Sequence, residues 1–205
     1  MNIVILANGN YPSHEVPLGY LGRADLIVCC DGAVEKLVTN GLEPGIIIGD
    51  LDSVTPALKR KYAGIIVQDL DQDTNDLTKA VNWCVDRNYD NLVILGATGN
   101  REDHTIGNIS LLAEYVKKTT VKMITDTGII TPHLTSSRFS SFRGQQISIF
   151  SVDPETGITS VGLKYKLENM KLRNWWQATL NEAEGNTFDL IFEGGPLIVF
   201  QKFRK

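Results

Sequence analysis

The stretch GIIIGDLD, residues 45–52, is an apolar run that ends in two carboxylates, Asp50 and Asp52. Four other short apolar runs also stop at polar or small residues: NIVILANG (2–9), LIVCCDGA (26–33), GIIVQDLD (64–71) and NLVILGAT (91–98). Apolar runs of this length between turn residues predict buried β-strands.

Segments with helical spacing lie between and after these runs. Residues 33–41 end at a glycine, residues 55–63 begin with Thr-Pro, and residues 76–88 carry an amphipathic pattern. The predicted apolar face of this last helix consists of Leu77, Ala80, Val81, Cys84 and Val85. Strands that alternate with helices predict a mainly parallel sheet covered by helices. In such α/β sheets ligands bind beyond the carboxyl ends of the strands, so we expect the polar endings to share one crevice.

The pattern changes after about residue 125, where Gly, Thr and Ser become frequent and helical periods disappear. A last long helix is predicted over residues 104–119. The later segments predict antiparallel strands separated by turns: QQISIFSVD (145–153), TSVGLKYKL (159–167), FDLIFEGG (188–195) and PLIVFQKF (196–203). We therefore expect an α/β domain over residues 1–125 and an all-β sandwich over residues 126–205.

Composition favours a small-molecule partner. The chain has 205 residues, a net charge of −4 and no runs of Lys or Arg, which argues against nucleic acid or an anionic membrane as a partner. The N-terminus lacks the basic region of a signal peptide, and no apolar stretch is long enough to span a bilayer, so we expect a cytoplasmic protein. Cys29, Cys30 and Cys84 fit buried thiols better than a disulfide or zinc site.

Two carboxylates as close as Asp50 and Asp52 repel one another unless a cation joins them. Mg²⁺ fits, because it prefers oxygen ligands and is commonly held by one or two carboxylates together with substrate phosphates. Asp76, in the first turn of a predicted helix, is the third expected ligand, and Lys79 on the same face is expected to contact phosphate. The alternative for Asp76 and Lys79 is a simple surface pair. For Asp69 and Asp71 a turn role is favoured.

The segment GATGNREDH, residues 96–104, complements the acidic residues. Its small residues allow a ligand to approach the backbone, and Arg101 offers a bidentate contact to phosphate oxygens. His104 is expected either to cap or pack at the helix start or to take part in catalysis. The dinucleotide fingerprint G-x-G-x-x-G and the Walker A sequence are both absent, which disfavours those two kinds of nucleotide site.

Four ordered segments together resemble thiamin pyrophosphokinases: CCDGAVEKL (29–37), IIIGDLDSV (46–54), DQDTNDLTKA (71–80) and GATGNREDHTIGNI (96–109). GLKYKL (162–167) and TLNEAEGN (179–186) resemble later segments of the same family, so the resemblance covers almost the whole chain. Asn100 departs from the Gly usual in the family, and Leu180 departs from the usual Ser. The departure at Asn100 falls in the loop expected to bind phosphate, and the departure at Leu180 falls in the segment expected to contact thiamin.

The resemblance implies a Mg²⁺-dependent transfer of the pyrophosphoryl group of ATP to the hydroxyethyl oxygen of thiamin, which yields thiamin diphosphate and AMP. Positioning and countercharge dominate such a reaction. The implied metal ligands are Asp50, Asp52 and Asp76. The implied phosphate contacts are Lys79 and Arg101, with His104 beside the ATP. Four further residues are implied to orient nucleotide, thiamin or metal-bound water: Asp31, Gln72, Asp73 and Asp103. Of these, Asp73 and Asp103 are also counted among the catalytic residues.

The resemblance also implies that residues 1–125 bind the nucleotide and carry catalysis and that residues 126–205 bind thiamin. It implies a homodimer with thiamin bound between the subunits. Thiamin is a cation with two aromatic rings, so Trp175 or Trp176 is expected to stack on it, with Gln72, Asp76 and Asn181 nearby. If both tryptophans lie on a strand, one points inward as core and the other outward. The alternative is that both pack within the sandwich or at a subunit interface.

Two other functions are kept open. Asp50 begins a D-x-D-x-V pattern that matches haloacid-dehalogenase-like phosphatases, in which the first Asp forms a phosphoenzyme. That pattern normally follows the first strand, whereas here it follows the third predicted one. The other alternative is a regulator that binds nucleotide or thiamin without turnover.

Overall fold

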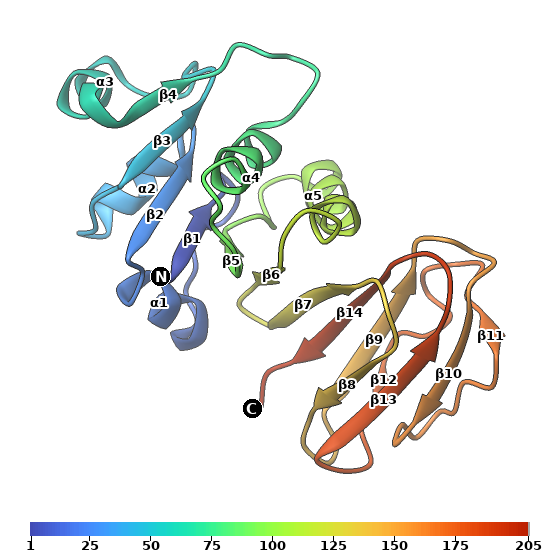
Figure 1. The fold of residues 1–205 in the computed structure, drawn as a ribbon. Helices are drawn as coiled ribbons and strands as arrows, with labels where there is room; N and C mark the ends of the chain where they lie inside the picture. Colours follow the sequence, from blue (N-terminus) through green and yellow to red (C-terminus); the bar gives the residue numbers. More distant parts are fainter. Residues whose placement is uncertain (205) are drawn as a thin grey trace. The chain divides into compact units, whose positions relative to one another are not determined.

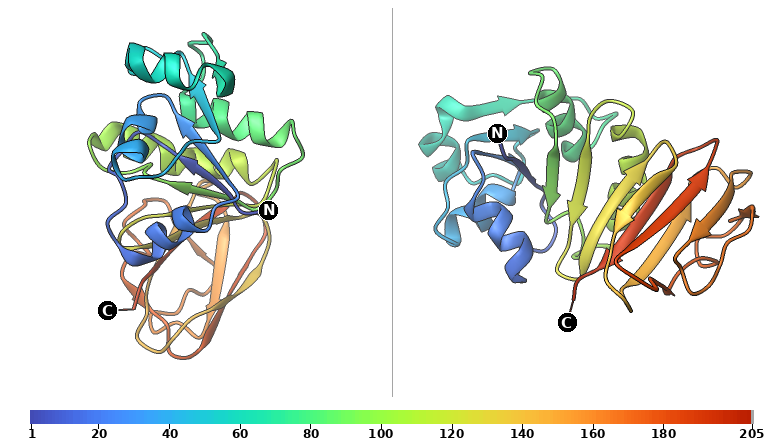
Figure 2. Two further views of the ribbon diagram at one scale, coloured as in Figure 1. Left: turned by 90° about the vertical axis from the view of Figure 1, so that its left-hand side faces the viewer. Right: turned by 60° about the horizontal axis from the view of Figure 1, so that its bottom comes forward.

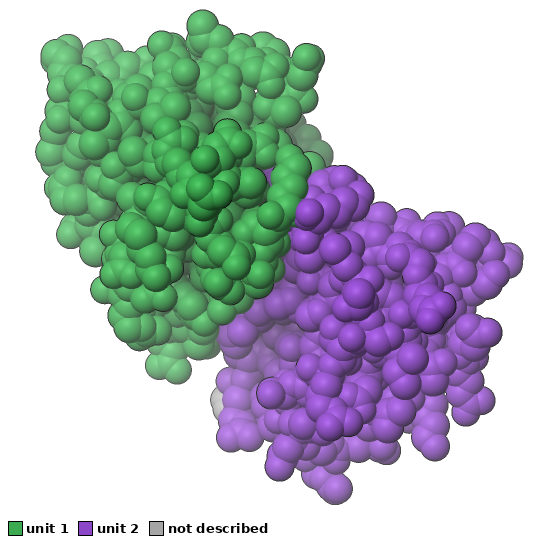
Figure 3. All heavy atoms as spheres, in the orientation of Figure 1, with its two compact units in different colours: residues 1–111, 118–126 green, residues 112–117, 127–205 purple. Residues whose placement is uncertain are grey.

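The structure, a computed structural model, describes residues 1–204 and divides into two compact units (Figures 1 and 3). Unit 1 comprises residues 1–111 and 118–126. Unit 2 comprises residues 112–117 and the chain from residue 127 onward.

The strands of unit 1 form a parallel arrangement. Their neighbours follow the order β6-β5-β1-β2-β3-β4, and the paired strands run in the same direction. Their bounds are β1 Ile3–Leu6, β2 Leu26–Cys30, β3 Ile46–Gly49, β4 Ile66–Gln68, β5 Leu92–Leu95 and β6 Val121–Ile124. All residues of β1 and β5 are buried, as expected for a parallel sheet covered on its faces. The five apolar runs of the sequence correspond to β1–β5.

Helices connect these strands: α1 Glu15–Gly22, α2 Ala33–Thr39, α3 Pro56–Lys61, the 3₁₀ turn η1 Ala63–Ile65, α4 Asp76–Val85 and α5 Glu102–Tyr115. Side chains cap the first turn of three of them. His14 Nδ1 accepts the Val16 N–H at α1, Thr55 Oγ1 accepts the Leu58 N–H at α3, and Asn75 Oδ1 accepts the Thr78 N–H at α4. Helix α4 packs against β1, β2 and β3. Sequence patterning does not predict α1, whose eight residues include a proline and two glycines.

The strand order reverses at β1, and this reversal positions the site. From β1 the chain adds β2, β3 and β4 on one side, then crosses to add β5 and β6 on the other. Such a reversal leaves a crevice at the carboxyl ends of the two strands that flank it. The segments that follow β1, β2, β3 and β5 therefore converge there.

Unit 2 contains antiparallel strands in two groups, which Figure 2 shows from two further directions. One has the order β12-β9-β14-β7 and the other β11-β10-β13-β8. The bounds are β7 Gly128–His133, β8 Ser137–Ser140, β9 Gln146–Ser151, β10 Gly157–Val161, β11 Met170–Lys171, β12 Asn181–Glu182, β13 Thr187–Phe192 and β14 Leu197–Lys202. The protein thus combines parallel and antiparallel pairing.

Both groups of strands in unit 2 contribute to one apolar core. Ile149 of β9 and Val199 of β14 belong to the same buried cluster as Ile158 of β10 and Leu190 of β13. Burial alternates along β9 and β13, as the period of a strand requires. One predicted strand is shorter than expected: β10 stops at Val161, because Gly162 takes a φ of 78° and turns the chain. No helix within residues 1–204 is both long and apolar enough to cross a membrane.

Candidate active site

Asp50 and Asp52 lie on a turn that brings both carboxylates to the same side. Leu51 between them has a φ of 70°, a conformation that L residues with a Cβ rarely adopt, and its side chain is buried. The Asp52 N–H donates to Asp50 Oδ1 over 3.1 Å, which closes the turn. Burial of Leu51 thus offsets the cost of a left-handed residue, and strain of this kind is common at functional sites.

Asp31, directly after β2, completes a cluster of three carboxylates. One carboxylate oxygen from each of Asp31, Asp50 and Asp52 lies within 4.8 Å of the other two. Asp31 is only 4 % exposed; its Oδ2 accepts the Ser53 N–H, while its buried Oδ1 has no hydrogen-bond partner among residues 1–204. Burial raises the pKa of Asp31, and hydrogen bonds from Ser53 and Gly32 oppose that rise. A hard cation would satisfy the orphaned oxygen and offset the mutual repulsion.

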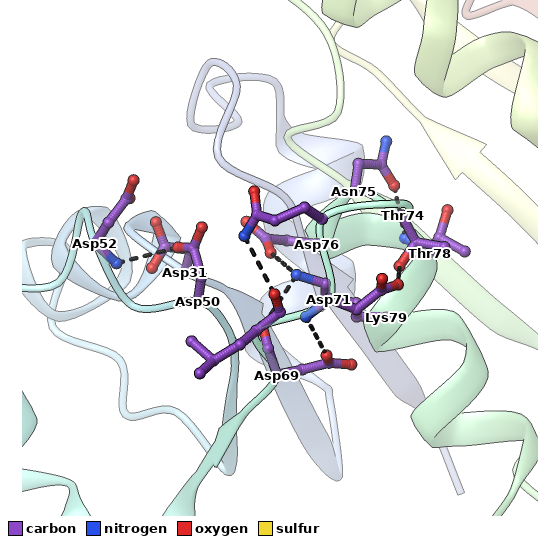
Figure 4. A network of polar contacts seen from close by, with 12 residues as sticks. Asp31, Asp50, Asp52, Asp69, Asp71, Thr74, Asn75, Asp76, Thr78 and Lys79 are labelled. Atoms are coloured by element: carbon purple, nitrogen blue, oxygen red, sulfur yellow. Dashed lines mark hydrogen bonds and ion pairs between the residues drawn. The ribbon is translucent and has the colours of Figure 1, made fainter.

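Asp76 lies at the start of α4, close to Asp31. A Cβ at Gly49 would stand 3.0 Å from Asp31 Cβ and 3.1 Å from Asp76 Oδ1, so only glycine at the end of β3 leaves room for both. Burial raises the pKa of Asp76, whereas the charge of Lys79 lowers it. Asp76 thus adds a fourth carboxylate to the neighbourhood of the cluster, as Figure 4 shows.

Lys79 is buried, and its ammonium lies beside the carboxylate of Asp76. Its side chain is 4 % exposed, and its ammonium donates to Asp69 O over 3.0 Å and to Asp76 Oδ1 over 3.4 Å. The pair is therefore more than the solvated surface pair considered as an alternative. The ammonium joins α4 to the loop that carries Asp69, and Lys79 is not among the residues that line the pocket described next.

A pocket of about 350 Å³ opens beyond the carboxyl ends of the strands of unit 1. Its walls come from the segments after β1, β2, β3 and β5, from the first turn of α4 and from α5. Among the predicted site residues, the structure places six in this lining: Asp31, Asp50, Asp52, Asp76, Arg101 and His104. The crevice expected from the polar strand endings is present.

The loop before α5 brings Arg101 and Asp103 together. Arg101 Nη2 lies 2.5 Å from Asp103 Oδ2, and both side chains are exposed. This contact is the main cause that lowers the pKa of Asp103 to about 2. Asp103 Oδ1 also accepts the His104 N–H, so the carboxylate of Asp103, and not the imidazole, makes the hydrogen bond at the helix start. Arg101 and His104 face the pocket with side chains that are exposed.

The loop of residues 69–75 is organised by its own carboxylates. Asp69 Oδ1 accepts the Asp71 N–H, and Asp71 accepts the Asp73 N–H and the Thr74 hydroxyl. The turn role favoured for Asp69 and Asp71 is thereby confirmed. Gln72 and Asp73 are exposed on this loop, outside the lining of the pocket. Their predicted contacts with substrate or metal-bound water stay predictions.

The two tryptophans lie in unit 2 on a turn, and not on a strand as the alternation argument assumed. Trp175 is 42 % exposed and Trp176 is 72 % exposed, so the expectation that one of them forms core is wrong. Trp175 contacts Phe150 with ring centroids 5.8 Å apart. A tight turn of residues 174–177, closed by a hydrogen bond from the Gln177 N–H to Asn174 O, replaces the strand.

Asn181 is buried, and its amide bridges two backbone segments. Asn181 Nδ2 donates to Tyr165 O, while Asn181 Oδ1 accepts the N–H groups of Tyr165 and Glu182. These contacts hold β12 against the 162–167 segment. The thiamin contact expected of Asn181 stays a prediction, and the bridge is the role that its hydrogen bonds describe.

Several pocket residues were not predicted from the sequence: Asn8, Ser53, Asn75 and Asn108. Asn8 had a signal, because it ends an apolar run as the predicted site residues do. Asn108 had none, since it lies inside α5 and reaches the pocket through a bond from its Nδ2 to Ala97 O. The departure at Asn100 is structurally accommodated, because its φ of 61° suits asparagine almost as well as glycine.

Comparison with known proteins agrees with this organisation. Residues 19–125 match the family model described as the catalytic domain of thiamin pyrophosphokinase, and residues 128–200 match the model described as its substrate-binding domain. The curated thiamin pyrophosphokinase 1 of Caenorhabditis elegans is 30 % identical over 165 residues, which cover 73 % of this chain and 68 % of that protein. The thiamine pyrophosphokinase of Bacillus subtilis is 33 % identical over 121 residues, 56 % of each chain.

Solved structures extend the similarity to the fold. The crystal structure of thiamine pyrophosphokinase from Bacillus subtilis superimposes with a TM-score of 0.83 at 26 % identity, and it covers 99 % of both chains. The thiamin pyrophosphokinase of Candida albicans shares the fold with a TM-score of 0.82 at 19 % identity, over 99 % of this chain and 90 % of that one. Since both halves of the sequence match the corresponding family models and the whole fold follows, this chain belongs to the thiamin pyrophosphokinase family.

Proposed function

We propose that this protein transfers the pyrophosphoryl group of ATP to the hydroxyethyl oxygen of thiamin, with release of thiamin diphosphate and AMP. The observation that carries the proposal is the cluster of Asp31, Asp50 and Asp52 in a pocket at the strand ends of a chain from this family. Phosphoryl-group transfer of this kind depends on positioned countercharge, and a pocket of carboxylates supplies it by holding cations.

We further propose Mg²⁺ as the divalent cation, with carboxylate ligands from Asp31, Asp50, Asp52 and Asp76. The donors fit, since all are oxygens and one of them, Asp31 Oδ1, is buried without a partner among residues 1–204. When bound, the cation would neutralise negative charge on the phosphate oxygens. The predicted ligand set of Asp50, Asp52 and Asp76 is retained, and Asp31 is added to it.

The remaining residues act by position and charge. Arg101 is the proposed direct phosphate contact, because its guanidinium is exposed at the pocket and rests on Asp103. His104 lines the same wall and is retained as an ATP contact. For Lys79 the buried contacts favour a different role from the predicted phosphate contact, namely orientation of Asp76. One of the carboxylates would accept the proton of the thiamin hydroxyl.

Unit 2 is proposed as a β-sandwich that binds thiamin. Its exposed Trp175 and Trp176 offer aromatic faces for a cationic ring system, and their exposure supports a role in binding a ligand or a second subunit. The homodimer, the division at residues 125 and 126, and the cytoplasmic location stay predictions. A net charge of −4 continues to argue against nucleic acid as a partner.

The test is formation of AMP and thiamin diphosphate from ATP, thiamin and Mg²⁺ by the purified protein. Asp52→Asn keeps the shape of the side chain and removes its charge, so we expect turnover to fall by about a hundredfold or more with circular dichroism unchanged. Chelation of the metal should abolish activity in the wild type. Full activity of Asp52→Asn, or of wild type in excess chelator, would contradict the metal assignment.

The same assay separates the two alternatives. A haloacid-dehalogenase-like phosphatase would form an acyl phosphate on Asp50 and follow ping-pong kinetics, whereas direct transfer requires a ternary complex. The position of Asp50 after β3, next to the edge strand β4, gives no support to a motif that normally follows the first strand. A regulator without turnover would bind ATP or thiamin and release no AMP.

A further inference from the structure

Two loops of unit 1 lie side by side and together form one wall of the pocket. Beyond the paired strands β1 and β5, hydrogen bonds continue from the Gly9 N–H to Gly96 O over 2.7 Å and from the Asn10 N–H to Thr98 O over 2.9 Å. The fit is close, because a Cβ at Gly9 would stand 2.5 Å from the carbonyl oxygens of Gly96 and Thr98. The loop after β1 is therefore held by its N–H groups on one side.

The carbonyl groups of the same loop are held by two side chains from elsewhere in the fold. Lys36 Nζ, on α2, donates to Asn8 O over 3.1 Å and to Gly9 O over 2.6 Å. Asn100 Nδ2 donates to the same Asn8 O over 3.2 Å. Burial lowers the pKa of Lys36, so its ammonium lies in a partly desolvated place where such hydrogen bonds are stronger than in water. Two donors thus converge on one carbonyl oxygen.

The orientation of the peptide between Asn8 and Gly9 matters for an anionic ligand. A carbonyl oxygen that faced into the pocket would repel phosphate oxygens, and a glycine offers little resistance to rotation of its peptide plane. The side chain of Asn8 is positioned at the same time, since its Nδ2 lies 2.8 Å from where a Gly32 Cβ would be, next to Asp31. A fixed peptide therefore keeps the Asn8 carbonyl oxygen on the Lys36 and Asn100 donors and the Asn8 side-chain amide beside Gly32.

We propose that Lys36 and Asn100 are positioning residues that together lock the Asn8–Gly9 peptide for binding of the ATP phosphates. The proposal rests on the proposed function for the identity of the ligand. It also gives a reason for the departure at residue 100, because glycine would fit the backbone there but would have no side chain to donate. In this arrangement Lys36 and Asn100 act through the loop, because their donors bind its carbonyl oxygens.

The test combines Asn100→Gly, Lys36→Met and the double variant. We expect the KM for ATP to rise about threefold in Asn100→Gly and about tenfold in Lys36→Met, with the KM for thiamin unchanged. Because either donor alone still holds the shared carbonyl, the double variant should lose more than the product of the two single effects. Two controls are Asn88→Gly, at a φ of 59° away from the pocket, and Glu35→Gln, on the same helix as Lys36.

Amide hydrogen exchange tests the tether without any reaction. The Gly9 and Asn10 amides should exchange faster in the double variant than in wild type, while amides of β14 in unit 2 should not change. Unchanged exchange at Gly9 and Asn10, an unchanged KM for ATP, or a double variant equal to the product of the singles would overturn the proposal. Wild-type protein that forms no thiamin diphosphate would instead contradict the proposed function. The exchange result would still show whether Lys36 and Asn100 hold the loop after β1.

Discussion

Left-handed residues mark the places where this chain departs from ordinary backbone geometry. Asp31, Leu51 and Asn100 all have positive φ, and all three line or adjoin the pocket. At Leu51 burial of the side chain offsets the strain, and at Asn100 the residue type reduces it. Leu180 in unit 2 also has a positive φ of 57°, but its side chain is 68 % exposed. Packing therefore contributes little there to offset the strain.

Replacement of Leu180 by asparagine should stabilise the protein. Asparagine tolerates the left-handed region better than leucine, so we expect a gain of about 0.5–1 kcal/mol and a rise in Tm of roughly 1–4 °C. Thermal unfolding followed by circular dichroism measures the shift. Leu70→Asn is the control, since Leu70 is 67 % exposed without a positive φ, and no such gain is expected there. Equal shifts in both variants would show that loss of exposed apolar surface, and not backbone strain, is the cause.

Loops in unit 1 are held by side chains that accept backbone N–H groups from distant segments. Asp126, which follows β6, accepts the N–H groups of Ser13 and His14 just before α1, and it also accepts the Ser13 hydroxyl over 2.6 Å. A stretch 113 residues away in sequence is thereby tied to the end of β6. Burial acts to raise the pKa of Asp126, but hydrogen bonds from Ser13 and His14 outweigh it, and the pKa is lowered.

Asp126→Asn should weaken this tie in a way that depends on pH. A carboxyl whose pKa is lower in the folded state stabilises the protein above its unfolded pKa of about 3.9, and this contribution disappears as pH falls through the folded value. At pH 7 we expect a loss of roughly 1 kcal/mol, since Asp126 is exposed and solvent weakens its bonds. Urea unfolding at pH 7 and at pH 3 should show the difference between variant and wild type shrinking at the lower pH. A difference that is the same at both pH values would contradict the charge-based explanation.

At the scale of the whole molecule, the chain separates two kinds of chemistry into two units. Unit 1 has the carboxylate cluster of Asp31, Asp50 and Asp52 and the pocket, whereas unit 2 presents exposed aromatic residues on an antiparallel framework. The family models divide the chain near the same point, with a catalytic domain over residues 19–125 and a substrate-binding domain over residues 128–200, although residues 112–117 belong to unit 2. Substitutions in unit 2 should accordingly change the KM for thiamin and leave the KM for ATP nearly unchanged.

Trp176→Leu tests this separation. If Trp176 stacks on thiamin, loss of its ring should cost about 1–2 kcal/mol and raise the KM for thiamin roughly tenfold, with the KM for ATP nearly unchanged. Thiamin titration should quench the fluorescence of wild type and quench the variant much less. Trp83→Leu is the control for loss of an indole, because Trp83 lies on α4 in unit 1. If Trp176→Leu leaves thiamin affinity intact but dissociates an oligomer in sedimentation analysis, the indole belongs to a subunit interface.

Local patterns were sufficient for β1–β5, for α2–α5, for β9, β10, β13 and β14, and for the choice of most acidic residues. They did not predict β6, β7, β8, β11 or β12. Apolar runs that stop at Asp, Asn or Gly predicted β1–β5, and helical spacing predicted the buried face of α4, because burial against a sheet imposes those periods. Resemblance of four segments identified the family. Helix α1 escaped prediction, since proline and glycine obscure its period.

Only the tertiary structure decided which side chains meet. The grouping of Asp31 with Asp50 and Asp52 requires β2 and β3 to be neighbours and Leu51 to turn left-handed, and neither follows from a local pattern. The direction of the Lys79 ammonium depends in the same way on the loop that carries Asp69. Residue types and periods are properties of short segments, whereas convergence depends on contacts between segments far apart in the chain. The sequence by itself therefore determined the family, the strand endings and the candidate residues, and the fold determined their partners.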